Sequence, residues 1–182
     1  MEQDHEVILA GFGGQGVLFA GLVLCHAGMS AGLNVAWIPC YGPEMRGGTA
    51  NCTVIISSQE IGSPIVSQPS AAMVMNEPSL AKYGPRVRPG GTLVVNCSLA
   101  RSIAARSNIR VVNIPASEIA LQLGNERVAN MVALGALVQT AGVLSLELVE
   151  RALPEALGPG KEQLLAANRE ALRRGARMAE LS

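Results

Sequence analysis

The strongest constraint on the fold lies near the start of the chain, where an apolar run, a glycine-rich turn and a long apolar segment follow one another. Residues 6–12 read EVILAGF and residues 17–32 read VLFAGLVLCHAGMSAG. A short apolar run that ends in glycines predicts a strand, and small and apolar residues over helical length predict a buried helix. The chain therefore begins with a strand, a tight turn and a helix.

The remaining sequence continues this alternation. Strands are expected at 34–40, 50–58, 71–76, 92–97 and 111–115, which are mostly apolar and bounded by Gly, Pro, Asn or Ser. A short helix is expected after Asn76 or Glu77 as its cap, with Pro78 in the first turn. Further helices are expected at 117–124, 126–142, 146–158 and 161–181. Ser145 is the expected N-cap of the helix at 146–158, and Pro154 is expected to end that helix or to open the next turn.

Strands that alternate with helices predict an α/β fold with a mostly parallel sheet covered on both faces. A chain of 182 residues suits one domain. The predicted fold is a single-domain Rossmann-like three-layer sandwich, with a core at 5–142 and a C-terminal helical region at 145–182.

Composition excludes several function classes. The formal net charge is zero, so no basic field would attract nucleic acid. No apolar run reaches the roughly 18 residues that a membrane span requires, and the acidic start is unlike a signal peptide; a cytoplasmic protein is expected. Cys25, Cys40, Cys52 and Cys97 form no CxxC motif. We therefore expect buried free thiols and no metal site.

The turn GFGGQG contains a G-x-G-x-x-G pattern and is the first candidate site. Its candidate anion-binding residues are Gly11, Gly13, Gly14, Gln15 and Gly16. Glycines let backbone N–H groups at a helix start approach an anion. The dinucleotide version also requires an acidic residue at the end of the second strand, where WIPCYG has none. A phosphate-bearing ligand, a protein partner, or helix–strand packing alone remain open, and Gln15 would donate to a ligand or cap the backbone.

The second candidate site is the loop YGPEMRGGTAN at 41–51. Glu44 and Arg46 are the only charged residues between Val7 and Gln59, a span in which average composition would place roughly eight. The candidate interface or cleft residues are Tyr41, Glu44, Arg46, Gly47, Gly48 and Asn51. Arg46 has the geometry for a forked contact with a carboxylate or phosphate. Contact with another subunit, lining of a ligand cleft, and an internal loop strut all remain open.

Taken in order, GFGGQG, YGPEMRGGTANC, IGSPIV, NEPSLAKY and PGGTLVVN give the chain a family resemblance. It resembles the gamma subunit of the 2-oxoacid:ferredoxin oxidoreductases, most closely the 2-oxoglutarate or branched-chain type. The equivalent module is an internal domain of pyruvate:ferredoxin oxidoreductase. The resemblance runs from about residue 5 to residue 142.

The resemblance implies a multisubunit enzyme that decarboxylates a 2-oxo acid, forms an acyl-CoA and passes electrons to ferredoxin. Thiamine diphosphate, magnesium, [4Fe–4S] clusters and coenzyme A are expected on or with other subunits. The expected partners are alpha and beta subunits, with delta as a further candidate. The isolated chain is expected to be inactive and to contain no catalytic residue, and its dimerisation when isolated stays open. The alternatives are a stand-alone nucleotide- or phosphate-binding module and a purely structural assembly subunit.

Overall fold

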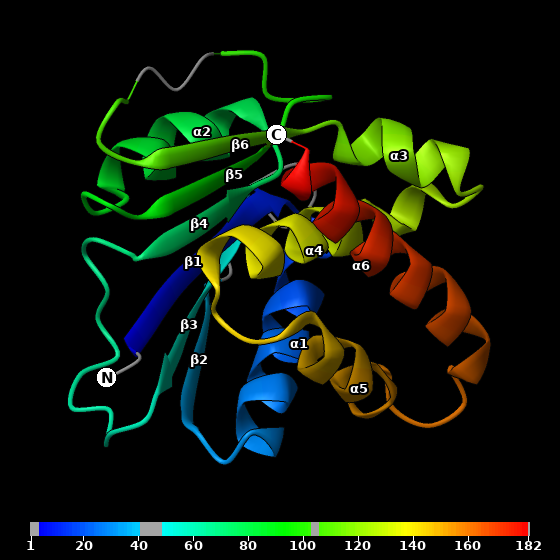
Figure 1. Cartoon of the computed structure of the whole chain (residues 1–182), viewed down its shortest axis with the longest axis horizontal. Helices are drawn as coiled ribbons and strands as arrows, with labels where there is room; N and C mark the ends of the chain where they lie inside the picture. The colour runs from blue at the N-terminus through cyan, green and yellow to red at the C-terminus, as the bar shows by residue number, and fades with distance from the viewer. Residues whose placement is uncertain (1–3, 41–48, 103–105, 182) are drawn as a thin grey trace.

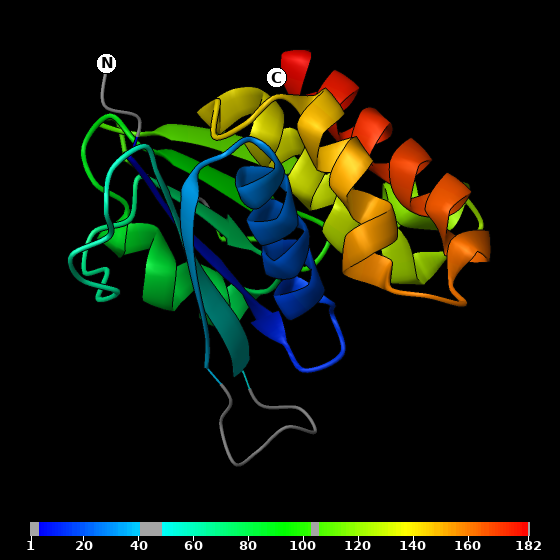
Figure 2. The same ribbon diagram turned by 90° about the horizontal axis from the view of Figure 1, so that it is seen from below.

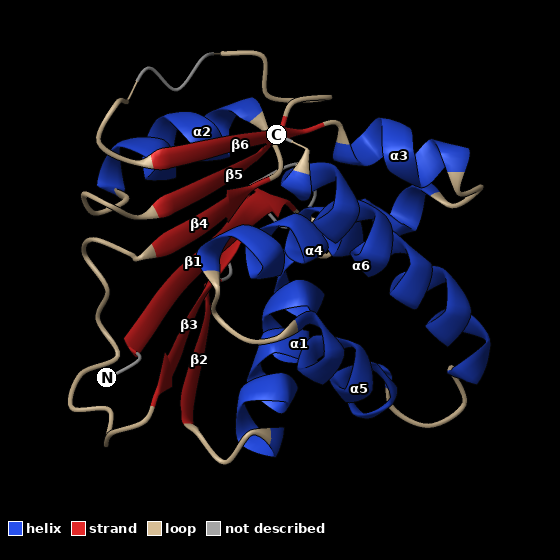
Figure 3. Ribbon diagram, in the orientation of Figure 1, coloured by secondary structure: helices blue, strands red, loops and turns tan. Residues whose placement is uncertain are grey.

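A computed structural model describes residues 4–40, 49–102 and 106–181. Its centre is a six-stranded sheet in the order β2-β3-β1-β4-β5-β6. Figure 1 shows the strands one below another, from β6 at the top to β2 at the bottom, and Figure 3 shows the same view coloured by element type. The strands are β1 (Asp4–Phe12), β2 (Asn34–Cys40), β3 (Thr49–Ser57), β4 (Ala71–Val74), β5 (Thr92–Asn96) and β6 (Arg110–Ile114). All six strand regions predicted from the sequence are present.

The sheet is mixed but mostly parallel. β1, β4, β5 and β6 run parallel, whereas β3 is antiparallel to both of its neighbours, β1 and β2. Only residues 41–48 separate β2 from β3, too short a link for the crossover that parallel neighbours require. The mostly parallel sheet predicted from the sequence is confirmed, with β3 as the reversed strand.

Helices flank both faces of the sheet unequally. They are α1 (Val17–Ser30), α2 (Glu77–Tyr83), α3 (Ala116–Gln122), α4 (Ala129–Ala141), α5 (Leu146–Leu157) and α6 (Leu165–Glu180), with 3₁₀ turns η1 (Gly84–Arg86), η2 (Glu126–Val128) and η3 (Glu162–Leu164). Figures 1 and 2 show α1, α4, α5 and α6 gathered on one face and α2 on the other. None of the helices in the described ranges is long and apolar enough to cross a bilayer.

Alternate residues of each central strand enter two separate cores. Leu9 and Met73 pack in the larger core with α1, α4, α5 and α6, whereas Ile8 and Ala72 pack in the smaller core with α2. This division follows from the strand period of two, which points successive side chains to opposite faces. Burial on both faces explains why the strands are apolar throughout instead of alternating with polar residues.

The prediction that Pro154 ends its helix or opens the next turn is wrong. Ser145 caps α5 as expected, with its hydroxyl accepting from the Leu148 N–H at 3.3 Å, but the helix continues through Pro154 to Leu157. Proline removes one helical N–H and crowds the preceding turn. The buried residues Val149, Leu153 and Leu157 hold the helix on both sides of the proline, so tertiary packing outweighs the local cost.

Five strands end at one edge of the sheet. β2 is antiparallel to β3 and β3 is antiparallel to β1, so β2 runs in the direction of β1, β4, β5 and β6. The segments that leave these strands therefore share this edge, hereafter the carboxyl edge. It gathers the glycine turn after β1, the start of α2 after β4, the loop after β5 and the start of α3 after β6. Open α/β sheets bind ligands at such an edge.

Candidate functional site: a groove at the carboxyl edge of the sheet

The glycine turn is shaped by close packing at two of its glycines. A Cβ on Gly11 would lie 2.7 Å from the Gln15 Oε1, and one on Gly16 would overlap the side-chain amide of Asn130. Gly16 also has a left-handed backbone, with φ of 71°, which L side chains rarely adopt. Gly13 and Gly14 are exposed. Helix–strand packing therefore explains Gly11 and Gly16, while Gly13 and Gly14 line the surface.

The start of α1 is open to an acceptor. No side chain caps its first turn within the described part of the chain, and that turn contains no acidic residue. The first N–H groups of a helix have no intrahelical partner, and the helix dipole makes this end favourable for negative charge. α1 spans 14 residues and starts directly after the exposed glycines of the turn. The carboxyl edge thus presents unpaired backbone donors.

Gln15 caps backbone and side-chain donors with its carbonyl oxygen. Its Oε1 accepts from the Phe12 N–H at 2.6 Å and from Asn76 Nδ2 at 3.1 Å. Because both partners are donors, the amide is fixed with its oxygen inward and its NH₂ group outward. Gln15 Nε2 has one long contact, 3.5 Å, to the Met75 carbonyl. Of the two roles predicted for Gln15, backbone capping is confirmed.

Asn96 connects the end of β5 to the start of α3 at the carboxyl edge, and the sequence analysis did not identify it. It is fully buried at the end of β5. Its Nδ2 donates to the Ser117 Oγ at 3.0 Å and to the Met75 carbonyl at 3.4 Å. Its Oδ1 accepts from the N–H groups of Ala116 and Ser117 at 3.1 and 3.4 Å, which begin α3. An asparagine that closes an apolar strand was the available signal, since a buried amide needs several partners.

Asn76 closes β4 in the same way and was predicted only as a helix cap. Its Oδ1 accepts from the Ser79 N–H at 2.9 Å, which confirms it as the N-cap of α2. Its Nδ2 meets Gln15, as described above. Glu77, the next residue, accepts from the N–H groups of Arg101 and Ser102 at 2.8 and 3.2 Å. The start of α2 therefore ties the glycine turn to the loop after β5.

A groove of about 430 Å³ lies over these residues. It is lined by Gly14, Gln15, Met75, Leu99, Ser117, Leu121, Glu126, Arg127 and Ala129. Leu99 and Leu121 are 49% and 55% exposed and give the groove apolar walls. Glu126 and Arg127 are exposed neighbours of opposite charge. The groove is therefore apolar along its walls, neutral in net charge, and floored by amide and hydroxyl groups.

The loop at 41–51, which contains Glu44 and Arg46, lies mostly outside the described residues. Tyr41, Glu44, Arg46, Gly47 and Gly48 belong to the range 41–48, which the structure does not describe. Asn51 lies in β3, half-buried, and pairs with Ala10 of β1 and Cys40 of β2. Thr49 pairs with Phe12, the last residue of β1. The residues that flank the loop thus lie at the carboxyl edge beside the glycine turn.

The four cysteines are free, but the prediction that all are buried is wrong for Cys40, which is exposed, and for the half-buried Cys97. Cys40 is the last residue of the edge strand β2, where one side of the strand has no neighbour to cover it. Burial raises the pKa of both the Cys25 and Cys52 thiols to about 12 and also raises the pKa of Cys97. No three metal-ligating side chains gather among the described residues.

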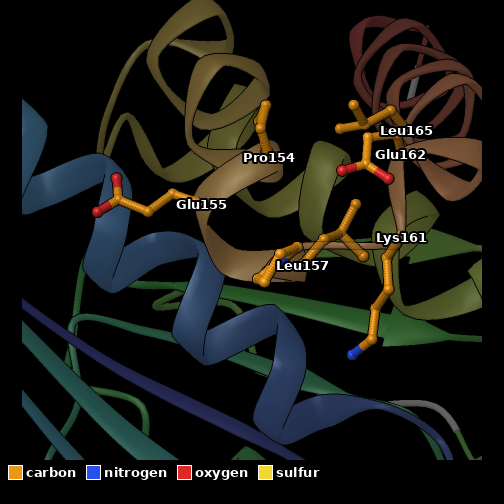
Figure 4. Close-up of a pocket in the computed structure, with 8 residues that line it drawn as sticks. Pro154, Glu155, Leu157, Lys161, Glu162 and Leu165 are labelled. Atoms are coloured by element: carbon orange, nitrogen blue, oxygen red, sulfur yellow. The ribbon is translucent and has the colours of Figure 1, made fainter.

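A second hollow, of about 280 Å³, lies on the outer helical layer where α5 turns into η3 and α6. Figure 4 shows Pro154 and Glu155 at one side and Lys161, Glu162 and Leu165 around the rest, with Glu155 on the side of α1. Glu155 Oε1 lies 3.5 Å from His26 Nδ1, which has no hydrogen-bond partner among the described residues. His26 lies roughly 15 Å along α1 from the glycine turn, at 1.5 Å per residue. This hollow is therefore separate from the carboxyl edge.

Known proteins resemble the chain over nearly its whole length. The family model for pyruvate ferredoxin/flavodoxin oxidoreductase matches residues 6–178. The ketoisovalerate oxidoreductase subunit VorA of Methanothermobacter marburgensis is 39% identical over 177 residues, which are 96% of this chain and 36% of that protein. The chain thus spans about a third of the length of this relative.

Two solved structures share the fold. The gamma subunit of a keto/oxoacid ferredoxin oxidoreductase from Geobacter sulfurreducens superposes with a TM-score of 0.83 and 30% identity, over 98% of this chain and 99% of that one. The second structure is the 2-oxoglutarate:ferredoxin oxidoreductase of Magnetococcus marinus, with 2-oxoglutarate, coenzyme A and succinyl-CoA bound. It superposes with a TM-score of 0.86 and 26% identity, over 99% of this chain and 32% of that one. The chain belongs to the pyruvate ferredoxin/flavodoxin oxidoreductase family and corresponds to its gamma subunit.

Proposed function

We propose that this chain works as the gamma component of a 2-oxoacid:ferredoxin oxidoreductase that converts a 2-oxo acid and coenzyme A to an acyl-CoA, with electrons passed to ferredoxin. The match to a free-standing gamma subunit from end to end supports a separate subunit. The chain also matches about a third of each of two longer chains, which supports a function in which it associates with domains equivalent to the rest of those chains. Its role is assembly and formation of the coenzyme A site.

The observation that carries this proposal is the uncapped start of α1 beside the groove. Gly13, Gly14 and Gly16 let backbone N–H groups approach an anion. Gln15 stabilises the turn by accepting a hydrogen bond from the Phe12 N–H. A diphosphate is the anion that such a turn suits. The related Magnetococcus marinus structure contains bound coenzyme A, which offers both a diphosphate and an extended arm.

Other parts of the complex would hold the remaining cofactors. Thiamine diphosphate, magnesium and [4Fe–4S] clusters are proposed for the alpha and beta subunits, with delta as a further candidate and the cytoplasm as the location. Cluster ligation requires several cysteine thiolates close together. The four thiols of this chain include two that are buried in the core. We propose that Glu44 and Arg46 contact a partner subunit or its cofactor beside the glycine turn.

Reconstitution with partner subunits tests this function. The genes flanking this one would be co-expressed with it under anaerobic conditions, and the purified assembly would be assayed for viologen reduction with 2-oxoglutarate and with branched-chain 2-oxo acids. We expect reduction that depends on coenzyme A and on the presence of this chain. Arg46→Ala is expected to lower assembly or turnover while the isolated chain keeps its fold.

Two results would argue for the alternatives. Recovery of the chain as a lone monomer from native cells, with tight binding of a free nucleotide, would favour a stand-alone binding module. Full activity of a complex whose Gly13 and Gly14 are both replaced by bulky residues would favour a purely structural subunit.

A further inference from the structure

We infer that a cluster of cations at the sheet edge opposite the carboxyl edge is a docking surface for a partner protein that presents a carboxylate-rich face. The cluster lies where α2 ends and where β5 and β6 begin (Figure 1). Hereafter the basic corner, it consists of Lys82, Arg86, Arg88, Arg106 and Arg110. The inference rests on the proposed function only in that the chain must work in a complex. It involves neither the glycine turn nor the groove beside it.

The charge of this part of the sequence is one-sided. Between Glu77 and Glu118 there are six Lys or Arg residues and no Asp or Glu. Five of the six form the basic corner, and the sixth, Arg101, lies at the carboxyl edge, where its N–H donates to Glu77. Because the whole chain has no net charge, its remainder carries an equal excess of acidic residues. The corner is therefore a local positive field on a neutral protein, which attracts a surface of opposite charge.

Contacts around η1 bring the five cations together. Arg106 Nη1 donates to three backbone carbonyls of the η1 segment at 2.7 to 3.1 Å. Arg86 donates to two carbonyls of the loop between β3 and β4, at 2.8 and 3.2 Å. Lys82 Nζ and Arg86 Cζ lie 5.1 and 5.5 Å from the centre of the Tyr83 ring. Arg110, the first residue of β6, pairs with the start of β5, so residues from two distant segments share one surface.

No carboxylate forms an ion pair with the basic corner among the described residues. The acceptors of Arg86 and Arg106 are carbonyl oxygens, which fix the two guanidinium groups without cancelling their charge. Lys82, Arg88 and Arg110 are exposed. By contrast, the four ion pairs within the described ranges all join side chains of α1, α5 and α6. The positive charge of the corner is thus held in place and left for a neighbour to neutralise.

An exposed apolar side chain lies beside these cations. Ile65 is 83% exposed, whereas Val66, the next residue, is buried. The Val66 carbonyl accepts from Arg86 at 2.8 Å, so the backbone that carries Ile65 is tied to the basic corner. The Ile65 N–H also donates to Ser63 Oγ at 3.3 Å. A fixed apolar side chain beside charged groups matches the composition of protein interfaces, which have an apolar centre and a polar rim.

A protein face suits this corner better than another polyanion does. Nucleic acid phosphates are bound by forked guanidinium contacts, but Arg86 and Arg106 already direct N–H groups at carbonyls. A bilayer surface calls for an amphipathic helix with a free apolar face, whereas α2 turns Leu80 and Tyr83 into the smaller core. In a second copy of this chain, ion pairs within α5 and α6 already use three glutamates. The occupant is therefore a carboxylate-rich face of a different protein.

Zero-length cross-linking of the assembled complex tests this docking surface. The complex co-expressed from this gene and its neighbours would be treated with a water-soluble carbodiimide, which joins a lysine amine to a carboxylate in contact with it. The chain has two lysines, Lys82 in the basic corner and Lys161 on the outer helical layer, and both are exposed. Mass spectrometry should find Lys82 joined to an Asp or Glu of another subunit and Lys161 joined to none. Added salt should lower the yield, because it screens the attraction.

A charge reversal with a matched control measures the contribution of the corner. Arg88→Glu should raise the Kd of the chain in the complex about tenfold or more, because it places like charges opposite each other. Arg151→Glu makes the same change in net charge at an exposed site on α5 and should leave the Kd unchanged. The Kd would be measured by dilution of each assembled complex, followed by mass photometry. Urea unfolding of the isolated chains checks that both variants keep their fold.

Ile65→Ser tests the apolar part of the surface. It should raise the same Kd about fivefold if the partner covers this side chain, and it should spare folding because Ile65 is already exposed. Leu181→Ser is the matched control, since Leu181 is 86% exposed at the end of α6, and it should change neither the Kd nor the stability.

The outcomes separate this inference from the function on which it rests. The docking surface would be overturned by an active complex in which Lys82 is joined to no other subunit or only to a second copy of this chain. Equal weakening by Arg88→Glu and Arg151→Glu would also overturn it. Binding of the isolated chain to DNA or to anionic phospholipid vesicles, lost in Arg88→Glu, would assign the corner to another polyanion instead. Failure of the chain to join any complex would overturn the proposed function, and this inference with it.

Discussion

The side-chain amide of Asn130 donates a hydrogen bond to the carbonyl oxygen of Gly16 at 2.9 Å and joins the starts of two helices that are 114 residues apart. Asn130 Oδ1 accepts from the Met131 N–H at 2.9 Å, so the amide is fixed. It also occupies the space that a side chain at residue 16 would need. This contact places the start of α4 against the glycine turn.

Gly16→Ala should destabilise the chain for two separable reasons. Its positive φ costs roughly 1–2 kcal/mol for a residue with a Cβ, and the overlap with Asn130 adds about 1–3 kcal/mol. Gly32→Ala is the matched control, because Gly32 has φ of 74° with open space around it. Urea unfolding should give a larger loss at Gly16 than at Gly32.

A double-mutant cycle then tests the Asn130 contact. Asn130→Ala alone should cost about 1 kcal/mol, since the Gly16 carbonyl keeps its bond from Ala20. In the double variant the overlap is relieved, so the combined loss should be smaller than the sum of the two. Strict additivity would contradict the packing described for this turn.

Gly135→Ala and Gly175→Ala should each destabilise the chain by about 3 kcal/mol or more, near the upper end for overpacking. A Cβ at Gly135 would overlap the backbone of Leu172, and one at Gly175 would overlap the backbone of Val132. Backbone cannot rotate away, so α4 and α6 must separate. Gly62→Ala, in open space with an ordinary φ, should stay within about 0.5 kcal/mol in the same urea titration.

Alkylation of the isolated chain at pH 8 should label Cys40 first and spare Cys25 and Cys52. Cys40 is exposed, whereas burial raises the pKa of the other two thiols to about 12. Only the thiolate reacts, and almost none forms four pH units below the pKa. Mass spectrometry after timed quenching checks the order, and urea should make all four reactive. Labelling of Cys52 in the folded chain as fast as Cys40 would contradict this core.

Glu77→Gln should speed amide hydrogen exchange at Arg101 and Ser102 near neutral pH. Hydrogen bonds from the Ser102 side chain and backbone, and from the Arg101 backbone, hold the pKa of the Glu77 carboxyl below its ordinary 4.5. A lowered folded pKa gives stability that is present above the unfolded pKa and is lost as pH falls through the folded value.

Acidification should therefore abolish the difference between the wild type and Glu77→Gln at these two amides. The wild-type amides should lose protection below about pH 4.5, the ordinary pKa of the carboxyl, while the variant should lose none in that range. Glu60→Gln, an exposed change, should leave both amides as in the wild type. Equal protection in wild type and Glu77→Gln at pH 7 would remove Glu77 as the anchor of this loop.

Strand positions were the most predictable part of the fold. β2 lies at 34–40 as expected, and α1 follows the glycine turn directly. These elements were predictable because continuous apolar runs, and the glycines that bound them, are local signals. The cap of α2 at Asn76 was also visible before Pro78. Pro154 was misjudged because the burial of Leu153 and Leu157, which lets α5 continue, depends on helices distant in sequence.

The candidate site was only half predictable. Gln15 and the exposed glycines were found from their motif, whereas Asn96 and Ser117 carry no motif of their own. They matter because parallel strands bring residues about 100 positions apart to one edge. Leu99 lies in the loop after β5 and Leu121 in α3, so the two line one groove only in the folded chain.

By itself the sequence determined the alternation of strands and helices, the family, and the turn that opens α1, because each depends on neighbouring residues. Only the tertiary structure decided that β3 lies between β1 and β2, that Gln15 turns its carbonyl inward, and that Asn96 ties the end of β5 to the start of α3. Those outcomes depend on which donors and acceptors meet across the sheet edge, and hydrogen bonds of 2.6 to 3.4 Å form only once distant segments are packed together.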